Sequence, residues 1–305
     1  MLMTNENSKN TTPAFHLKNV RKTYNVKRIP NNVFRECRLN PAPEGENWRM
    51  KCGSEPICWT ECPRGWALWI DEMKIPRGQT TAILGHSGSG KTTLLYLLAL
   101  LDTLDSDSEK LECNYIKPST SSLKTLTLPN KDKKRIKLNQ IRQELFGFVF
   151  QSGYLTSNLT ALQNVALPLA LGGCDIADIS KRVKALTTKM NFPEGRIRAL
   201  PRQLSGGEYQ RIAVARALSH NPQIVFADEP TGNLDPVTGN MVMKLLIDWC
   251  NEEESRTLIL VTHNMQHALD YCQHIFVLSG GKITLDSPRE NIKTVKELEK
   301  CLKNE

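Results

Sequence analysis

The chain has 305 residues, of which 40% are hydrophobic and 24% charged, which is the composition of an ordinary globular protein. This excludes a disulfide-stapled miniprotein, a wholly disordered chain and a collagen-like fibre. The length fits one large domain or two small ones. The formal net charge of +8, from 40 Lys and Arg against 32 Asp and Glu, favours anionic partners such as nucleotides, nucleic acids or lipid headgroups.

No part of the sequence predicts a membrane-spanning segment. The longest purely apolar run, residues 94–101, is far shorter than the roughly 20 residues that a helix needs to cross a bilayer. The first ten residues lack an apolar stretch after a positive charge and do not resemble a secretory signal. Nine cysteines, an odd number, favour reduced thiols over a disulfide framework. We therefore expect the protein in the cytoplasm.

Short apolar runs alternate with helical patterns along the chain, and this alternation predicts an α/β fold. The expected strands are almost continuously apolar, which is typical of parallel strands covered on both faces. They are residues 79–84, 146–150, 223–227 and 257–262. A leucine-rich stretch at 91–101 predicts a buried helix directly after the first strand. Runs at 275–278 and 282–285 flank a Gly-Gly pair and predict an antiparallel β-hairpin at the sheet margin.

The remaining segments divide the chain into a core and additions. Between residues 165 and 216 the strand pattern gives way to helical patterns around 178–190 and 206–219. We expect one domain over residues 1–305, with a parallel core, an inserted helical subdomain and a terminal helix. Their expected bounds are 14–150 and 217–290 for the core, 151–216 for the subdomain and 291–303 for the helix. Surface additions are expected at 26–65, which is rich in Pro, Asn and Cys, and at 105–137, which shows little periodicity.

A glycine-rich loop follows the first predicted strand and fits the pattern G-x-x-x-x-G-K-[ST]. Its residues are Gly85, His86, Ser87, Gly88, Ser89, Gly90, Lys91, Thr92 and Thr93. Glycines allow backbone N–H groups to surround phosphates, and the helix N-terminus adds positive dipole character. Lys91 is expected to reach the β- and γ-phosphates, and the Thr92 hydroxyl to complete Mg²⁺ coordination. Because a strand precedes the loop and a helix follows it, the sequence predicts a nucleotide phosphate site.

Two adjacent acids, Asp228 and Glu229, stand at the carboxyl end of a predicted buried strand, where open α/β sheets form their ligand crevice. Asp228 is the expected Mg²⁺ ligand. Glu229 is the expected acceptor that orients and deprotonates the attacking water, because in-line hydrolysis needs a base opposite the leaving group. The pair therefore predicts nucleotide hydrolysis rather than binding alone.

A second anion-binding helix start is predicted at Leu204-Ser-Gly-Gly-Glu, which contains Ser205, Gly206 and Gly207. If the helical subdomain holds this motif away from Lys91, both cannot bind the same phosphate in one chain. The sequence then suggests an intermolecular site, with two copies closing head to tail.

The ordered set of motifs resembles the ATP-binding-cassette (ABC) ATPase family. Gln151 follows the strand at 146–150, Asp235 ends Gly-Asn-Leu-Asp, and His263 lies in Val-Thr-His, as in that family. The pair Leu101-Asp102 and the segments 159–168 and 227–235 resemble the lipoprotein-releasing and macrolide-exporter type. The resemblance covers about residues 15–285 and implies a P-loop NTPase, RecA-like core. Tyr209 departs from the family, which more often has glutamine there, and we assign it no function.

The resemblance implies further roles. Tyr24 would stack on adenine, although it could also be an ordinary strand-edge tyrosine displaced by the 26–65 addition. Gln151 would sense Mg²⁺ or the attacking water and relay its state to a membrane partner. His263 would contact the γ-phosphate and steady Glu229. Ser205, Gly206 and Gly207 would bind the γ-phosphate held by a second copy, and Asp235 would lie between the copies.

The implied function is that of an ATP-hydrolysing subunit which dimerises around two ATP molecules, with a second copy or with a related ATPase. The dimer would drive a separate integral membrane permease from the cytoplasmic face of the inner membrane. Export or extraction of a lipid, lipoprotein, peptide or drug is expected. An alternative is a cell-division-type ATPase that transmits force without transport. A nucleic-acid ATPase is supported only by the basic balance, and we expect no nucleic-acid partner.

A cysteine cluster in the first addition leaves two interpretations open. Cys37, Cys52, Cys58 and Cys62 end in a Cys-x₃-Cys pair that is compatible with Zn²⁺, but no Cys-x₂-Cys pair is present. Free thiols in a loop, or a redox pair, fit as well. The basic run at 131–137 fits either a solvated loop or an anion-facing surface.

Overall fold

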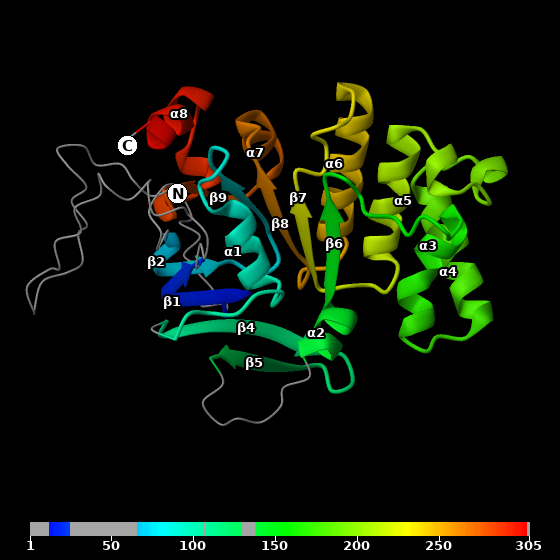
Figure 1. Cartoon of the computed structure of the whole chain (residues 1–305), viewed down its shortest axis with the longest axis horizontal. Coiled ribbons are helices and arrows are strands. Elements are labelled where there is room, and N and C mark those ends of the chain that lie inside the picture. The colour runs from blue at the N-terminus through cyan, green and yellow to red at the C-terminus, as the bar shows by residue number, and fades with distance from the viewer. Residues whose placement is uncertain (1–11, 25–65, 107, 130–137, 304–305) are drawn as a thin grey trace, which may run out of the picture.

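The computed structural model describes residues 12–24, 66–106, 108–129 and 138–303, which form two sheets and a set of flanking helices (Figure 1). The strands are β1 (Phe15–Thr23), β2 (Trp66–Ile75), β3 (Thr80–Leu84), β4 (Lys110–Lys117), β5 (Ser122–Leu128), β6 (Phe146–Phe150), β7 (Ile224–Asp228), β8 (Thr257–Thr262), β9 (His274–Ser279) and β10 (Lys282–Pro288). The helices are α1 (Lys91–Leu98), α2 (Leu138–Leu145), α3 (Ala161–Leu171), α4 (Ile176–Lys189), α5 (Gly206–Leu218), α6 (Pro236–Asn251), α7 (Met265–Tyr271) and α8 (Val295–Lys303). Short 3₁₀ turns are η2 (Glu194–Arg196), η3 (Pro201–Gln203) and η4 (Arg289–Asn291).

The larger sheet has the order β10-β9-β3-β8-β7-β6, with β10 antiparallel and the other pairs parallel. This confirms the predicted α/β core and its hairpin margin. The apolar runs are continuous because each strand is covered on both faces. On β3, Ala82 and Leu84 enter one hydrophobic cluster and Ile83 enters the other, as the two-residue period of a strand requires.

The smaller sheet is antiparallel, in the order β2-β1-β4-β5, and it corrects one expectation. Residues 105–137 were expected to be a surface addition without periodic structure, but β4 and β5 lie within them and β4 pairs with β1. Leu111, Cys113 and Leu126 are buried in the cluster that encloses α1. These strands were not predicted because only one face of the smaller sheet is apolar, and β5 has few buried positions.

Helices α3, α4 and α5 gather at one end of the molecule, and β7, β8 and β6 separate them from α1 (Figure 1). The helices expected around 178–190 and 206–219 correspond to α4 and α5. The expected terminal helix begins later than predicted, at Val295, and η4 precedes it at Arg289–Asn291. Among the described residues, none of the helices combines the length and the apolarity needed to cross a bilayer.

Candidate nucleotide-binding site

The predicted phosphate loop joins β3 to α1. Gly88 and Gly90 adopt φ angles of 81° and 98°, a left-handed region that favours glycine. A Cβ on Gly90 would lie 2.5 Å from the Ala67 carbonyl oxygen, so no larger residue fits there. Lys91 Nζ donates to the carbonyl oxygens of Gly85 and His86, both at 2.8 Å, which places the ammonium group inside the curve of the loop.

Tyr24 lies beside this loop despite the long segment that follows it in sequence. A hollow of about 320 Å³ is bounded by the aromatic ring at one side and by the loop at the other. Its lining residues are Tyr24, Ala67, Ser87, Gly88, Gly90, Lys91, Thr92 and Thr93. The Tyr24 side chain is half-exposed, with a hydroxyl bonded to Asp102. A phosphate site and an aromatic face thus share one cavity, the arrangement that a nucleotide needs.

The predicted acids lie at the end of β7, which β8 separates from β3 in the sheet; Asp228 is the last residue of β7 and Glu229 follows it. Burial lowers the pKa of Lys91, and the nearby charges of Glu229 and Asp228 oppose that shift. Burial and the Glu229 charge raise the pKa of Asp228, whereas Lys91 lowers it. These mutual influences show that the lysine of the loop and the two acids form one electrostatic cluster, which is typical of a functional cleft.

Glu229 is held in a defined orientation by the end of β8. Its Oε1 accepts from the His263 backbone N–H at 2.8 Å and lies 2.7 Å from His263 Nδ1, and its Oε2 accepts from Thr262 Oγ1 at 3.2 Å. The Glu229 backbone has φ 46°, an uncommon value for a residue with a side chain. The His263 ring is 72% exposed, so its free edge faces outward while Glu229 is positioned behind it.

Gln151 follows β6 and contacts the loop that follows Glu229. Its Nε2 donates to Asn233 Oδ1 at 3.3 Å. A Cβ on Gly232 would lie 2.7 Å from the same nitrogen, so glycine leaves room for the amide. Because β3, β8, β7 and β6 are neighbours in the sheet, their carboxyl ends bring the loop, His263, the acid pair and Gln151 to one edge.

Ser205 and the following glycines start α5 in a different place. Ser205 Oγ accepts from the Glu208 N–H, and Glu208 Oε2 accepts from the Ser205 N–H at 2.8 Å, forming a capping box. Within the described residues, none of Ser205, Gly206 and Gly207 lines the hollow beside the phosphate loop.

The two glycines differ in what surrounds them. A Cβ on Gly207 would lie 2.8 Å from Thr238 Cγ2 of α6, so packing inside the chain explains that glycine. A Cβ on Gly206 would meet nothing within 4 Å, so packing inside the chain does not explain Gly206. Asp235 caps α6 by accepting from the N–H groups of Val237 and Thr238, close to this motif.

The structure also reveals contacts that the sequence did not suggest. Tyr209, to which we assigned no function, accepts a 2.9 Å hydrogen bond from the Leu155 N–H. Arg216 donates to the carbonyl oxygens of Gly153 and Tyr154, both at 2.7 Å. Gln210 is buried and donates to the carbonyl oxygens before Gln151 and after Glu229, those of Phe150 and Pro230, at 3.0 Å each. Helix α5 therefore holds the backbone around Gln151 in place. The only feature of the sequence that pointed to these bonds was the presence of polar residues in a helix expected to be buried.

Some predicted residues lie outside the described ranges. Cys37, Cys52, Cys58 and Cys62 are among them, as is the basic run at 131–137. Within the described ranges, no group of three or more His, Cys, Asp or Glu side chains is placed to hold a metal ion. The described cysteines are free thiols, and burial raises the pKa of Cys113 to about 12.

The fold and the cavity define a P-loop nucleoside-triphosphate hydrolase. Comparison with known proteins specifies the family. The model of the ABC transporter family matches residues 70–232, and the chain belongs to that family. The protein is therefore an ATP-hydrolysing cassette, and the resemblance seen in the sequence is confirmed.

Three similar proteins illustrate this membership. The lipoprotein-releasing system ATP-binding protein LolD of Legionella pneumophila is 39% identical over 213 residues, which cover 70% of this chain and 86% of LolD. The macrolide export ATP-binding/permease protein MacB of Bartonella quintana is 38% identical over 222 residues, which cover 73% of this chain but only 31% of MacB. A solved dimeric ATP-binding cassette, in a post-hydrolysis state with ADP and phosphate, matches with a TM-score of 0.64 at 32% identity, over 90% of this chain and 98% of that one.

Proposed function

We propose that two copies of the chain close head to tail around two ATP molecules and that the ATPase cycle drives a separate membrane permease. The observation that carries this proposal is the division of the site within one chain. The phosphate loop and Glu229 share one sheet edge, whereas Gly206 faces open space at the start of α5. The similar solved cassette is itself a dimer. A second copy supplies the anion that this exposed helix start is built to bind.

Within each closed site, the side chains have separate tasks. Tyr24 contacts adenine, Lys91 binds the β- and γ-phosphates, and Glu229 accepts the proton of the attacking water while His263 contacts the γ-phosphate. Thr92, Asp228 and Gln151 offer the hydroxyl, carboxylate and amide oxygens that Mg²⁺ prefers. Burial and the neighbouring Glu229 charge raise the pKa of Asp228, and a bound cation would oppose that shift. Mg²⁺ there would neutralise phosphate charge.

The names of two relatives support a class of transported molecule. LolD is named for lipoprotein release and MacB for macrolide export, and MacB joins its ATP-binding part to a permease. These names support export or extraction of a lipid, lipoprotein, peptide or drug, from the cytoplasmic face of the inner membrane. Identification of the membrane protein that co-purifies with this chain from detergent extracts would distinguish these cargoes.

Dependence on protein concentration tests the dimer. Because a complete site needs two chains, the specific ATPase activity of the purified chain should fall on dilution, and the rate should rise with the square of concentration while dimers are scarce. Steady-state hydrolysis at saturating ATP over a hundredfold range of protein concentration measures this. A specific activity that is constant over the whole range would contradict the proposal. DNA or RNA should not stimulate the rate.

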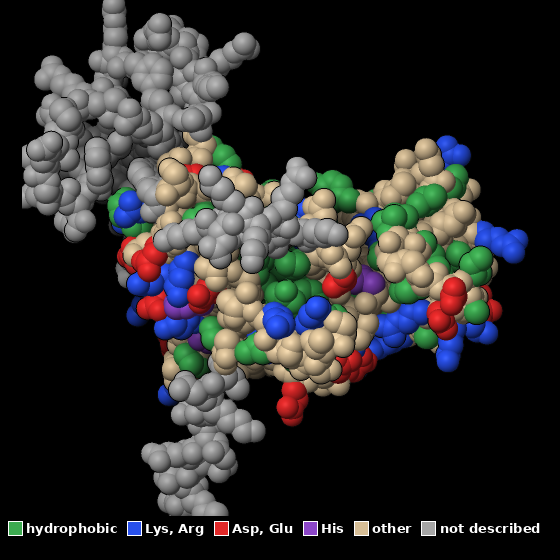
Figure 2. Space-filling view, turned by 90° about the horizontal axis from the view of Figure 1, so that it is seen from below, with side chains coloured by type: hydrophobic (Ala, Val, Ile, Leu, Met, Phe, Trp, Pro, Cys, Tyr) green, Lys and Arg blue, Asp and Glu red, His purple; other side chains and the backbone are tan. Residues whose placement is uncertain are grey.

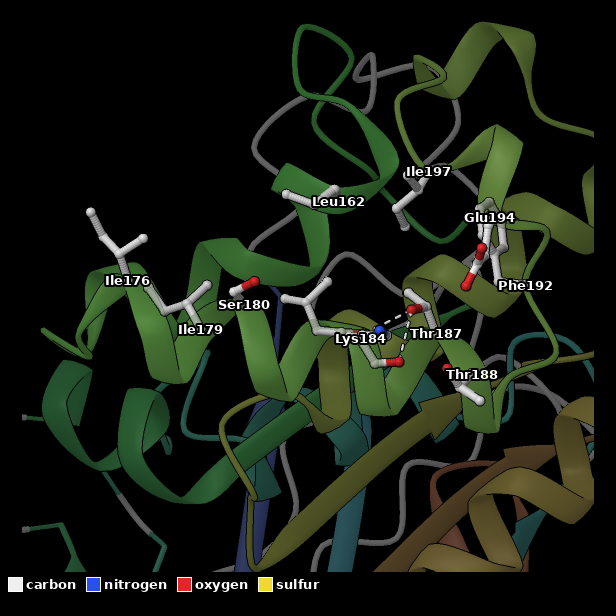
Figure 3. A pocket seen from close by; sticks show the side chains of 11 residues that line it. Leu162, Ile176, Ile179, Ser180, Lys184, Thr187, Thr188, Phe192, Glu194 and Ile197 are labelled. Carbon is white, nitrogen blue, oxygen red and sulfur yellow. Dashed lines mark hydrogen bonds between the residues drawn. The ribbon is translucent and has the colours of Figure 1, made fainter.

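The surface that we propose for the permease lies on α3 and α4. A cavity of about 520 Å³ has α4 along one side and Leu162 and Ile197 opposite (Figure 3). Ile176 at its rim is 86% exposed and Leu162 is 41% exposed. Hydrophobic side chains are visible at this end of the molecule in Figure 2. Exposed apolar groups around a hollow are typical of a protein contact surface. The cavity also belongs to the helical segment that follows Gln151, the residue expected to relay the nucleotide state.

We therefore expect Ile176→Glu to lower recovery of the co-purifying membrane protein about tenfold, because a carboxylate would be buried without a partner in the contact. Basal ATPase activity of the isolated chain should be unchanged. A glutamate at the start of α4 suits the helix dipole, so folding is preserved. Lys296→Glu, in the first turn of α8, is the control. Equal recovery with Ile176→Glu and wild type would contradict this placement.

Zinc remains open. Metal analysis of protein purified without chelator separates the zinc and free-thiol interpretations of Cys37, Cys52, Cys58 and Cys62, and less than about half an equivalent of zinc excludes the metal site.

A further inference from the structure

The end of β1, and Tyr24 directly after it, are bound to the segment that follows α1. Asp102 provides the central contact, because its two carboxylate oxygens hold two different side chains. Lys22 Nζ donates to Asp102 Oδ1 at 2.8 Å, and the Tyr24 hydroxyl donates to Asp102 Oδ2 at 3.1 Å. Lys22 also donates to the Thr103 carbonyl oxygen at 2.7 Å, and the Thr103 N–H donates to Asp102 Oδ1 at 2.7 Å.

A second carboxylate secures the strand next to this contact. The backbone N–H and the hydroxyl of Thr23 both donate to Asp105 Oδ2 at 2.7 Å. Two residues earlier in β1, the Arg21 N–H donates to Ser108 Oγ at 3.0 Å, and Ser108 Oγ donates back to the Arg21 carbonyl oxygen at 3.0 Å. The last residues of β1 are therefore bonded, one after another, to Asp102, Thr103, Asp105 and Ser108.

The positive charge of Lys22 is balanced by the negative charge of Asp102. The Lys22 side chain is only 8% exposed and Asp102 is 26% exposed, so the ion pair is shielded from water. Burial acts to raise the pKa of Asp102, but hydrogen bonds from Lys22, the Thr103 N–H and Tyr24 outweigh it and lower the pKa below its usual range. Lys22 Nζ also lies 5.4 Å from the centre of the Tyr24 ring, within the range of a cation–π contact.

We propose that Asp102 is a positioning residue for nucleotide binding, which fixes the Tyr24 ring beside the phosphate loop so that adenine meets an aromatic face already in place. This rests on the proposed function, in which Tyr24 contacts adenine. Tyr24 is half-exposed and directly follows β1. Its hydroxyl is bonded to Asp102 and lies within hydrogen-bond reach of the Thr93 side chain, so the far end of the ring is restrained at the hydroxyl. A ligand bound by a pre-positioned side chain does not have to order that side chain itself.

The test compares binding of Mg-ADP with binding of inorganic pyrophosphate, by calorimetry on the full chain. Tyr24→Phe keeps the ring and removes the hydroxyl, and Asp102→Ala removes the acceptor. Each should weaken Mg-ADP binding about two- to tenfold, the range expected for one hydrogen bond, and the double variant should be no weaker than the single ones. Pyrophosphate binding should stay unchanged. Asp286→Ala removes a carboxylate that is bonded to His274 at 2.7 Å, outside the hollow, and is the matched control.

Tyr24→Ala tests the adenine contact separately from the positioning role of Asp102. If Tyr24→Ala binds Mg-ADP like wild type, the adenine contact is wrong and the positioning role falls with it. If Tyr24→Ala weakens Mg-ADP binding but Tyr24→Phe and Asp102→Ala do not, the adenine contact stands and the positioning role is overturned. Equal weakening of Mg-ADP and pyrophosphate by Asp102→Ala would also overturn it, since the carboxylate would then act on the phosphate loop. Tyr24→Phe decides the question if Asp102→Ala fails to fold.

Discussion

Replacement of Glu229 by glutamine should convert the chain into a stable dimer with ATP bound. Glutamine has nearly the same shape. Its amide oxygen can still accept from the His263 N–H, and its amide nitrogen can donate to Thr262 Oγ1, which then accepts instead of donating, so ATP binding should persist. It cannot take a proton from water, and loss of a general base lowers hydrolysis by at least about a hundredfold. Without hydrolysis, the closed state should accumulate in the presence of ATP and Mg²⁺.

Size-exclusion chromatography with light scattering measures this, at micromolar protein with and without ATP. Glu252→Gln, which changes a half-exposed glutamate at the end of α6, is the control and should behave as wild type. A Glu229→Gln chain that stays monomeric with ATP would show that the closing mechanism is wrong.

A second substitution, Gly206→Glu, should abolish that dimer. A Cβ on Gly206 would have no neighbour within 4 Å, so the new side chain displaces nothing within its own chain. A glutamate in the first turn of α5 also suits the helix dipole. In a closed dimer, however, the carboxylate would stand where the second copy presents its γ-phosphate. Repulsion between two anions in a dry interface should therefore make Glu229→Gln/Gly206→Glu monomeric at all ATP concentrations that saturate Glu229→Gln.

The matched control for this experiment is Gly195→Glu in the same background. Gly195 also has open space where a Cβ would lie, and the charge change is the same. That variant should still dimerise. Both variants should bind Mg-ADP with unchanged affinity, because Tyr24 and Lys91 remain in place. Loss of Mg-ADP binding in Gly206→Glu alone would mean that α5 contributes to the site of its own chain, and the head-to-tail arrangement would then be refuted.

Local chemistry determined which parts of the fold and site could be predicted. The phosphate loop and the acid pair were accessible because each stands directly after an apolar strand, and parallel strands place their carboxyl ends together. The strand pattern at β3, β7 and β8 was unambiguous for the same reason, since both faces are buried. Tyr24 could be placed only through the family resemblance, because β2 and the 26–65 addition separate it from the loop in sequence.

Other features depend on contacts between distant residues and left little trace in the sequence. Strands β4 and β5 were missed because their polar faces look like loop composition. The bonds from Asp102 and Asp105 to β1 join residues about eighty positions apart, and a lone aspartate carries no information about such a partner. The hydrogen bond that the Tyr209 hydroxyl accepts from the Leu155 N–H likewise joins distant residues and could not be predicted from the sequence.

Helix α5 has a mechanical consequence for the dimer. In the dimer that we propose, its first turn would contact the nucleotide of the other copy. Its flank is bonded, through Gln210 and Arg216, to the backbone on either side of Gln151. A rigid helix that is attached at both places cannot move at its first turn without also moving the backbone around Gln151. A change at one nucleotide would therefore move the segment around Gln151 in the other copy, so the two hydrolysis events should be cooperative rather than independent.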